Sequence, residues 1–250
     1  MIDPRPSVVA ARLAGIGRIA AFCSAKGGVG KTLCTTLAGL ALAARGKNVG
    51  ILDLDLQGST AHLFLGVRPG MPREDKGILP LPVTDLESAR GGGLVLMGAG
   101  VFAGNRALAL RGHEVSDAIL ELLAVTIWGP LDALLLDLPP GIGEEVMDLA
   151  RLVPRLQAFV VSTPSAASTA VVERLLAFLS EVKVPVAGVI ANMTRGDDSS
   201  VRDLASRFDA RYAGEVPWEP QVEPALGSAA RLGQTAAAAA MDAVLKGAGW

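Results

Sequence analysis

The sequence predicts an α/β fold, a mainly parallel twisted sheet with helices on both faces, and two features carry that prediction. Short apolar runs alternate with longer segments compatible with helix, which is typical of parallel sheets built from strand–helix–strand units. Two of these apolar runs end in aspartate, at Asp53 and Asp137. The predicted strands are 18–24, 48–53, 94–98, 132–137, 157–163, 185–191 and 211–216, and the predicted helices are 31–45, 115–126, 144–153, 165–181, 198–208 and 228–246.

The first predicted strand leads into a glycine-rich loop, Lys26-Gly-Gly-Val-Gly-Lys-Thr32, and a helix follows at once. Glycines let successive backbone N–H groups converge on phosphates, and the helix adds the positive end of its dipole. In this Walker A frame, Lys31 reaches the β- and γ-phosphates of a nucleotide and the Thr32 hydroxyl binds Mg²⁺. A solvated turn is the alternative interpretation, and the flanking apolar strand and helix disfavour it. The predicted nucleotide contacts here are Gly27, Gly28, Val29, Gly30, Lys31, Thr32 and Leu33.

The second predicted strand, 48–53, is almost continuously apolar, as expected for a strand covered on both faces. It ends in Asp53, and Asp55 follows two residues later, so in extended geometry both carboxylates point the same way. We expect them at the carboxyl edge of the sheet, where folds of this kind bind ligands. The alternative is that Asp55 and Ser59 cap a helix that begins near Thr60.

The strand at 132–137 ends in another aspartate, Asp137, after a hydrophobic run. This is the Walker B pattern, whose aspartate holds Mg²⁺ directly or through water. The sequence Pro139-Pro140-Gly141 follows, and prolines hold the backbone in a defined turn. We expect the Gly141 N–H to sense the γ-phosphate, and Asp132 to be a cap or turn residue.

Two later residues complete the predicted site. Asn192 follows the predicted strand 185–191, and its side chain offers both a donor and an acceptor to the polar edge of adenine. An asparagine after a strand is otherwise a common turn residue. Pro217, after the last predicted strand, is also expected to contact the nucleotide. Because these residues and the glycine-rich loop must meet on one ligand, we expect a single domain over 18–250, preceded by an N-terminal arm, 1–17, which could instead be a stray helix.

A second lysine at the start of the loop narrows this interpretation. With Lys26 five residues before Lys31, the loop resembles the deviant Walker A motif of the MinD, ParA, ArsA and Mrp ATPases. The resemblance implies a P-loop NTPase fold of the SIMIBI type, which forms a homodimer that closes on ATP. It implies that Lys26 reaches the partner subunit's nucleotide. Lys26, Lys31 and Asp55 are then the expected catalytic residues, and Thr32, Asp53 and Asp137 the expected metal ligands.

In the same resemblance, residues 53–58 form switch I, with Asp53 in the Mg²⁺ shell and Asp55 orienting the attacking water, and residues 139–143 form switch II. From about residue 18 to residue 223 the chain looks like the Mrp family, also called ApbC-like, whose members carry or scaffold iron–sulfur clusters. The stretches that carry this resemblance are Arg111-Gly112 with 115–125 and Trp128-Gly-Pro-Leu-Asp132, Asp137-Leu-Pro-Pro-Gly-Ile-Gly-Glu144, and Val186-Ala-Gly-Val-Ile-Ala-Asn-Met193.

The Mrp resemblance implies a slow ATPase that handles a cluster, a cluster-assembly partner or a client apo-protein. A ParA- or MinD-like ATPase that organises DNA, membranes or protein complexes is the alternative, and a nucleotide-bound scaffold that scarcely hydrolyses is a third possibility. Family members that carry a cluster have a Cys-x-x-Cys soon after the Asn-Met, whereas this chain has only Cys23 and Cys34. We expect both to be small buried residues, so an iron–sulfur cluster is not expected to bind directly.

Composition limits the classes of protein to which this chain could belong. The 250 residues have a formal net charge of -2 and two cysteines, which argues against a disulfide framework, and no basic tract suggests nucleic-acid binding. No apolar run approaches the roughly 20 residues that a membrane span needs, and no signal pattern is present, so a cytoplasmic location is expected. The alanine-rich segment 228–245 is expected to pack in the core, and 66–93 to be a long mobile loop. His62 and His113 are expected to be ordinary surface or packing residues.

Overall fold

An eight-stranded sheet forms the centre of the protein in its computed structural model, which describes residues 3–86, 90–103, 112–153 and 155–250. The strand order is β3-β4-β2-β5-β1-β6-β7-β8. Within the described ranges, only the short edge strand β3 pairs in the antiparallel sense, with β4. The strands are β1 Ile16–Cys23, β2 Asn48–Asp53, β3 Leu81–Pro82, β4 Gly93–Gly98, β5 Leu131–Asp137, β6 Leu156–Ser162, β7 Val186–Thr194 and β8 Tyr212–Pro217.

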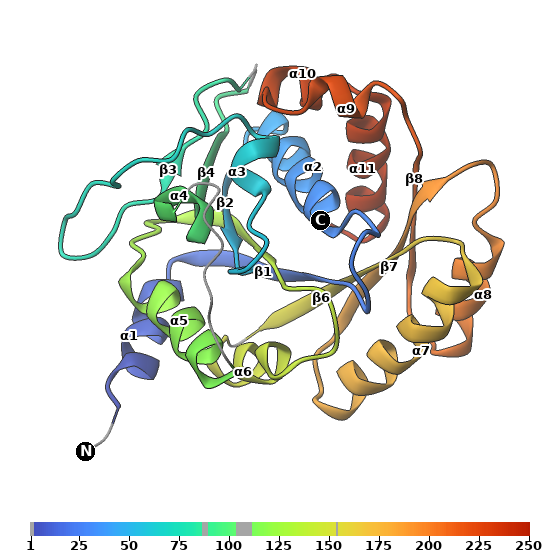
Figure 1. Cartoon of the computed structure of the whole chain (residues 1–250), viewed down its shortest axis with the longest axis horizontal. Helices are drawn as coiled ribbons and strands as arrows, with labels where there is room; N and C mark the ends of the chain where they lie inside the picture. The colour runs from blue at the N-terminus through green and yellow to red at the C-terminus, as the bar shows by residue number, and fades with distance from the viewer. Residues whose placement is uncertain (1–2, 87–89, 104–111, 154) are drawn as a thin grey trace.

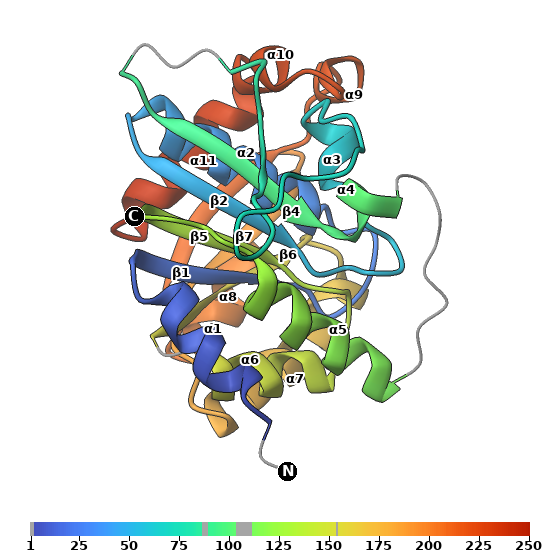
Figure 2. The same cartoon turned by 90° about the vertical axis from the view of Figure 1, so that its left-hand side faces the viewer.

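Helices cover both faces of this sheet (Figures 1 and 2). One face carries α2, α3, α9, α10 and α11, and the opposite face carries α1, α5, α6, α7 and α8. The predicted α/β fold with a mainly parallel sheet is therefore confirmed. The helices are α1 Arg5–Leu13, α2 Lys31–Ala44, α3 Ala61–Phe64, α4 Ala99–Ala103, α5 Gly112–Val125, α6 Glu144–Leu152, α7 Ala166–Glu181, α8 Ser199–Arg207, α9 Val222–Ala225, α10 Ala229–Gly233 and α11 Ala236–Gly247.

The core consists of two apolar layers, one on each face of the sheet. In β1, Ile19, Ala21 and Cys23 belong to the layer under α1 and α5 to α8, whereas Ala20 and Phe22 belong to the layer under α2 and α11. This alternation follows from the two-residue period of a strand. It explains why the central strands read as continuous apolar runs, because both of their faces are buried.

The alanine-rich segment at the C-terminal end differs from its prediction as a single helix over 228–246. It forms two helices, α10 and α11, separated at Gln234 and Thr235. The Thr235 hydroxyl accepts a hydrogen bond from the Ala238 N–H at 3.2 Å, which caps the first turn of α11. The Glu219 carboxylate accepts from two further N–H groups of that turn, at 3.1 and 2.7 Å. The caps supply the partners that the first N–H groups of a helix lack.

The N-terminal region and the segment 66–93, which was expected to be mobile, both have defined contacts. The region expected to be an arm contains α1, which packs against α5 through ion pairs from Arg5 to Asp117 and Glu121. In the 66–93 segment, Ile78 exchanges backbone hydrogen bonds with Val125 and Ile127, at 2.7 and 2.9 Å. These contacts fix the segment near its middle. Residues 87–89 of that segment, and Arg111, lie outside the described residues.

Candidate functional site

The glycine-rich loop connects the carboxyl end of β1 to the start of α2, as predicted. Gly30 has a φ of 80°, in the left-handed region, and a Cβ atom at this position would lie 2.2 Å from the Asn192 Nδ2 atom. Glycine is therefore required at position 30 both for backbone conformation and for close packing. The Asn192 Nδ2 atom donates to the Val29 carbonyl at 2.8 Å, so the end of β7 holds the loop in place.

Asp137 lies beneath the start of α2, fully buried, and receives three hydrogen bonds from that helix. Lys31 Nζ donates to Asp137 Oδ1 at 2.7 Å, and Thr32 Oγ1 donates to Oδ2 at 2.7 Å. Thr35 Oγ1 also donates to Oδ1, at 2.9 Å. These donors compensate a buried carboxylate that would otherwise be costly. Thr35 was not among the predicted site residues, although its position one helical turn after Thr32 places both hydroxyls on one helix face.

Asp53 lies beside Asp137, because β2 and β5 pair in register at these two residues. The Asp53 side chain is buried, and its Oδ2 atom accepts from the Ser59 hydroxyl at 2.8 Å and from the backbone N–H groups of Thr60 and Ala61, both at 3.1 Å. Burial, and next the neighbouring Asp137 carboxylate, raise the pKa of Asp53 to about 7.

In the segment from Asp53 to Ala61, Asp53 caps the helix that begins near Thr60, because its Oδ2 atom accepts from the N–H groups of Thr60 and Ala61. The alternative, that Asp55 and Ser59 cap that helix, is wrong. The first N–H groups of α3 bond to Asp53, Ser59 donates its hydroxyl to Asp53, and the Asp55 Oδ1 atom accepts from the Gly58 N–H at 3.0 Å. Asp53 thus fixes the whole segment, and the Asp55 carboxylate lies at the cavity described next.

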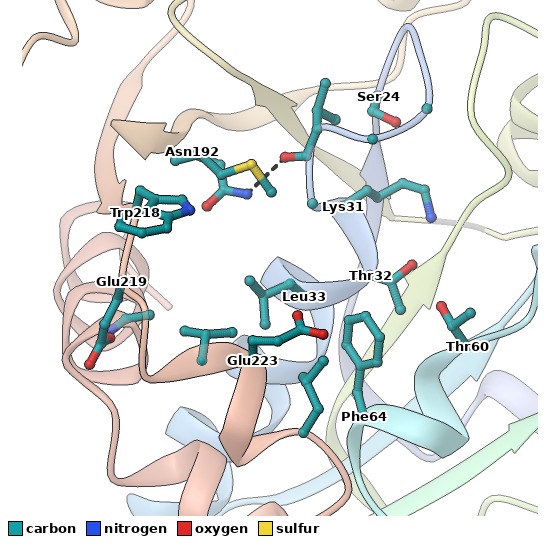
Figure 3. A pocket seen from close by; sticks show the side chains of 18 of the residues that line it. Ser24, Lys31, Thr32, Leu33, Thr60, Phe64, Asn192, Trp218, Glu219 and Glu223 are labelled. Carbon is teal, nitrogen blue, oxygen red and sulfur yellow. Dashed lines mark hydrogen bonds between the residues drawn. The ribbon is translucent and has the colours of Figure 1, made fainter. Parts of the chain in front are cut away.

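A cavity of about 650 Å³ opens above the loop and extends toward the ends of β7 and β8 (Figure 3). All the predicted loop residues from Lys26 to Leu33 line it, as do Asp55, Asn192 and Pro217. Asp53, Asp137 and Gly141 are not part of its lining. The Gly141 N–H donates to the Ser24 carbonyl at 2.8 Å, which joins the segment after β5 to the start of the loop.

Several cavity residues were not predicted from the sequence. Most of them follow β8, and the only signal for them was their position directly after Pro217 at the carboxyl end of a parallel strand. The additional lining residues are Ser24, Thr60, Phe64, Pro140, Met193, Trp218, Glu219, Pro220, Val222, Glu223, Leu226 and Ala237. Figure 3 shows Asn192 and Trp218 on one side of the cavity and Lys31 and Thr32 on the other. The cavity is thus long enough to offer two different chemical ends to one ligand.

Asn192 lies within β7 rather than after it, since that strand continues to Thr194. Its side chain is buried. The donor side of the amide faces Val29, because a carbonyl oxygen can only accept, so one of the two N–H groups on Nδ2 is already used within the protein. The acceptor Oδ1 and the second N–H of Nδ2 are the parts of this amide left for a ligand.

Both cysteines are buried and free, as expected. They belong to different core layers, Cys23 on one face of the sheet and Cys34 on the other. Burial raises the pKa of the Cys23 thiol to about 12, and it also raises the pKa of the Cys34 thiol. Among the described residues, no group of three or more His, Cys, Asp or Glu side chains could hold a metal ion. Of the two histidines, His62 is buried and His113 is exposed.

No helix in the described parts of the chain combines the length and the apolar character needed to cross a membrane.

The chain is similar in sequence and in fold to several known proteins. The iron–sulfur cluster carrier protein of Mycobacterium tuberculosis is 32% identical over 241 residues, covering 91% of this chain and 61% of that protein. The chain therefore spans less than two thirds of that relative's length. The cytosolic Fe-S cluster assembly factor CFD1 of Candida glabrata is 32% identical over 241 residues, covering 88% of this chain and 82% of that protein.

Among solved structures, a nucleotide-binding protein from Archaeoglobus fulgidus in complex with ADP has a TM-score of 0.74 and 27% identity, covering 92% of this chain and 93% of that one. The cell division ATPase MinD of Pyrococcus furiosus has a TM-score of 0.64 and 18% identity, covering 92% of this chain and 98% of that one, and shares the fold. The model of the family described as ParA: NUBPL iron-transfer P-loop NTPase matches residues 15–246. The protein therefore belongs to this ParA family of NUBPL-type iron-transfer P-loop NTPases.

Proposed function

We propose that this protein binds and hydrolyses Mg-ATP, and that closure of an ATP-bound homodimer serves iron–sulfur cluster assembly or transfer in the cytoplasm. The observation that carries the proposal is the single cavity that joins the phosphate loop at Lys31 and Thr32 to Asn192 at the end of β7. A ligand with phosphates at one end and a polar base at the other fits these two ends. The family and its relatives, named as cluster carriers and assembly factors, support this reading over a DNA or membrane organiser.

At the phosphate end, the residues present fit a magnesium nucleotide. The Thr32 hydroxyl and the Asp137 carboxylate are hard oxygen ligands held together at 2.7 Å, the chemistry that Mg²⁺ prefers. Thr32 and Asp137 would hold the ion, with Asp53 beside them as an outer carboxylate, and bound Mg²⁺ would neutralise charge on the phosphates. Lys31 exchanges its contact with Asp137 for one with the β- and γ-phosphates. The backbone N–H groups from Gly27 to Leu33 surround the same phosphates.

At the base end, the Asn192 Oδ1 atom accepts a hydrogen bond from the exocyclic amine of adenine. Guanine has a carbonyl oxygen at the equivalent place, and two acceptors facing each other in a buried site are unfavourable. The commitment of Nδ2 to Val29 prevents the amide from rotating to suit guanine. This fixed amide therefore favours ATP over GTP. Pro217 lines the same end of the cavity.

Hydrolysis requires a positioned water and a compensated phosphate charge. Asp55, held by the Gly58 N–H at the cavity wall, orients the water. Lys26 also lines the cavity and is only half-buried, and we propose that its ammonium group serves the nucleotide of the partner subunit when two copies meet. The Gly141 N–H moves from Ser24 to the γ-phosphate when ATP is bound. These roles make the complete catalytic site a property of the dimer.

Cluster handling in this protein is indirect. The two cysteines lie on opposite faces of the sheet and are buried, so they cannot ligate one cluster together without unfolding part of the core. We therefore propose that ATP-driven closure acts on a partner or client apo-protein that itself holds the cluster.

The experiment that tests this function combines anaerobic incubation with iron and sulfide, visible spectroscopy, metal analysis and an ATPase assay. We expect Mg-dependent ATP turnover and a nearly colourless protein without stoichiometric iron. Stoichiometric iron and sulfide that disappear in Cys23→Ser or Cys34→Ser would overturn indirect handling. Failure to bind either ATP or ADP would overturn the nucleotide site itself.

A further inference from the structure

Trp218 is a large apolar side chain left half exposed at the cavity. It is the first residue after β8, lines the cavity, and is 50% exposed. The other two tryptophans, Trp128 and Trp250, pack in or against the core. An exposed indole beside a cavity of ligand size is suited to contact a flat apolar ligand.

The indole is held in place before any ligand binds. The backbone N–H of Trp218 donates to the Thr194 carbonyl at 2.9 Å, which ties the main chain of this residue to the end of β7. The Arg195 guanidinium lies over the indole, with its central carbon 4.7 Å from the ring centroid, within the range of a cation–π interaction. Prolines at positions 217 and 220 restrict the backbone on both sides. A ligand that contacts this ring therefore pays little to order it.

Arg195 covers one face of the indole and is not part of the cavity lining. The ring itself lines the cavity, so its second face is the part available to a ligand. Trp218 and Asn192 lie on the same side of the cavity, opposite Lys31 and Thr32 (Figure 3). A nucleotide whose phosphates lie at Lys31 thus brings its base to the place where the indole and the Asn192 amide meet.

We propose that Trp218, backed by Arg195, is the stacking platform for the nucleotide base. This inference rests on the proposed ATP site and assigns different roles in base binding to two residues, Trp218 and Asn192. Stacking uses the π-face that every base has, so Trp218 supplies affinity without selecting among bases. The Asn192 amide supplies the selection. Arg195 is a positioning residue, since it contacts the indole and not the base.

Calorimetry on two ligands tests the platform. In Trp218→Ala we expect the affinity for ADP to fall by roughly tenfold or more, the range measured for loss of one base–aromatic stack. Inorganic tripolyphosphate, which has no base, should bind this variant as it binds the wild-type protein. Trp218→Phe should keep most of the ADP affinity, and Arg195→Gln should lose less than Trp218→Ala.

Tryptophan fluorescence provides an independent readout. ADP should quench the emission of the wild-type protein and of the control variants Trp128→Phe and Trp250→Phe. Trp218→Phe should bind ADP without this change. Unchanged ADP affinity in Trp218→Ala, or ADP quenching that survives in Trp218→Phe, would overturn the platform while leaving the nucleotide site in place. A wild-type protein that binds neither ADP nor tripolyphosphate would overturn both.

Discussion

Lys31 and Asp137 form an ion pair of 2.7 Å, with side chains that are 6% and 0% exposed. The lysine proposed to contact the phosphates therefore has a buried partner when no nucleotide is present. Its charge is compensated in either state, by a carboxylate or by phosphates, which avoids the cost of an isolated buried ammonium. In the proposed ATP site, nucleotide binding would replace the Asp137 carboxylate by phosphates as the partner of Lys31.

Lys31→Ala removes that cation, and we expect it to weaken ADP and ATP binding by roughly 100-fold. A hydrogen bond to a charged group contributes about 1.5–3 kcal/mol, and Lys31 is expected to contact two phosphates. Calorimetry measures the loss, and Lys47→Ala, an exposed lysine paired with Asp132 at the other end of the sheet, is the matched control. The same change should also lower the free energy of unfolding by about 3–5 kcal/mol, because it leaves Asp137 buried without its cation. Unchanged nucleotide affinity in a folded Lys31→Ala protein would refute the site.

Asp55→Ala should keep nucleotide binding and slow hydrolysis by about 10²-fold, the order expected when a group that assists proton transfer is lost. The control is Asp55→Asn, which keeps an acceptor for the Gly58 N–H but lacks the carboxylate charge, and it should hydrolyse as slowly. Steady-state phosphate release and calorimetry separate the two effects. A variant with normal turnover and weakened binding would show that Asp55 only shapes the loop.

The raised pKa of Asp53 predicts a pH dependence of stability in the nucleotide-free protein. Its folded pKa is about 7, above the value of about 3.9 for an unfolded aspartate, so the folded state binds more protons between these values. The contribution is fully present below about pH 4 and is lost as the pH rises to about 7, with a slope of at most about 1.4 kcal/mol per pH unit. Urea unfolding at several pH values measures it.

Asp53→Asn is the comparison for that series. It cannot ionise, so the difference in unfolding free energy between wild type and variant should change with pH from about 4 to 7 and become constant above that range. A difference that does not depend on pH would mean that Asp53 has an ordinary pKa in the folded protein.

Lys26→Ala should leave ATP binding by a single subunit largely intact and remove both ATP-dependent dimerisation and most of the hydrolysis. The reason is that phosphate charge facing the interface would then lack compensation. Light scattering with a non-hydrolysable ATP analogue reports the dimer, and phosphate release reports turnover.

Mixing Lys26→Ala with Asp55→Ala tests whether Lys26 serves the partner subunit's nucleotide or that of its own subunit. A mixed dimer has one site that combines Asp55 of its own subunit with Lys26 from the other, so partial activity should return. If heterodimers form and no activity returns, Lys26 serves its own subunit.

The sequence identified the parts of the site that depend on local pattern. The loop from Lys26 to Thr32 and the strands ending at Asp53 and Asp137 were found because glycine spacing and apolar runs are local signals. Trp218 was missed although it directly follows Pro217, because position after a strand does not show which side chains line a cavity. The donation from Thr35 to Asp137 joins residues 102 positions apart, and only the packed sheet brings them together.

The break between α10 and α11 shows a different limit. Alanine favours helix across the whole segment, so local propensity predicts one helix over 228–246. The N–H groups at the start of α11 are satisfied by Glu219 as well as Thr235, and Glu219 lies outside the segment, in the loop after β8. Thr235 is a residue type that often caps helices, but the surrounding alanines favour a continuous helix. Tertiary contacts decide between the two outcomes.

The hydrogen bond from Asn192 to Val29 couples the two ends of the cavity mechanically. The amide nitrogen bonds to the loop at Val29, and the same side chain lines the cavity, where we propose that its oxygen contacts the base. A substitution that truncates Asn192 is therefore expected to change both the shape of the phosphate loop and the contact with the base. Its effects on affinity for the base and on affinity for the phosphates cannot be separated. A relative of this protein that selected guanine would need a different hydrogen bond to hold the phosphate loop, because changing the base contact at position 192 also removes the bond to Val29.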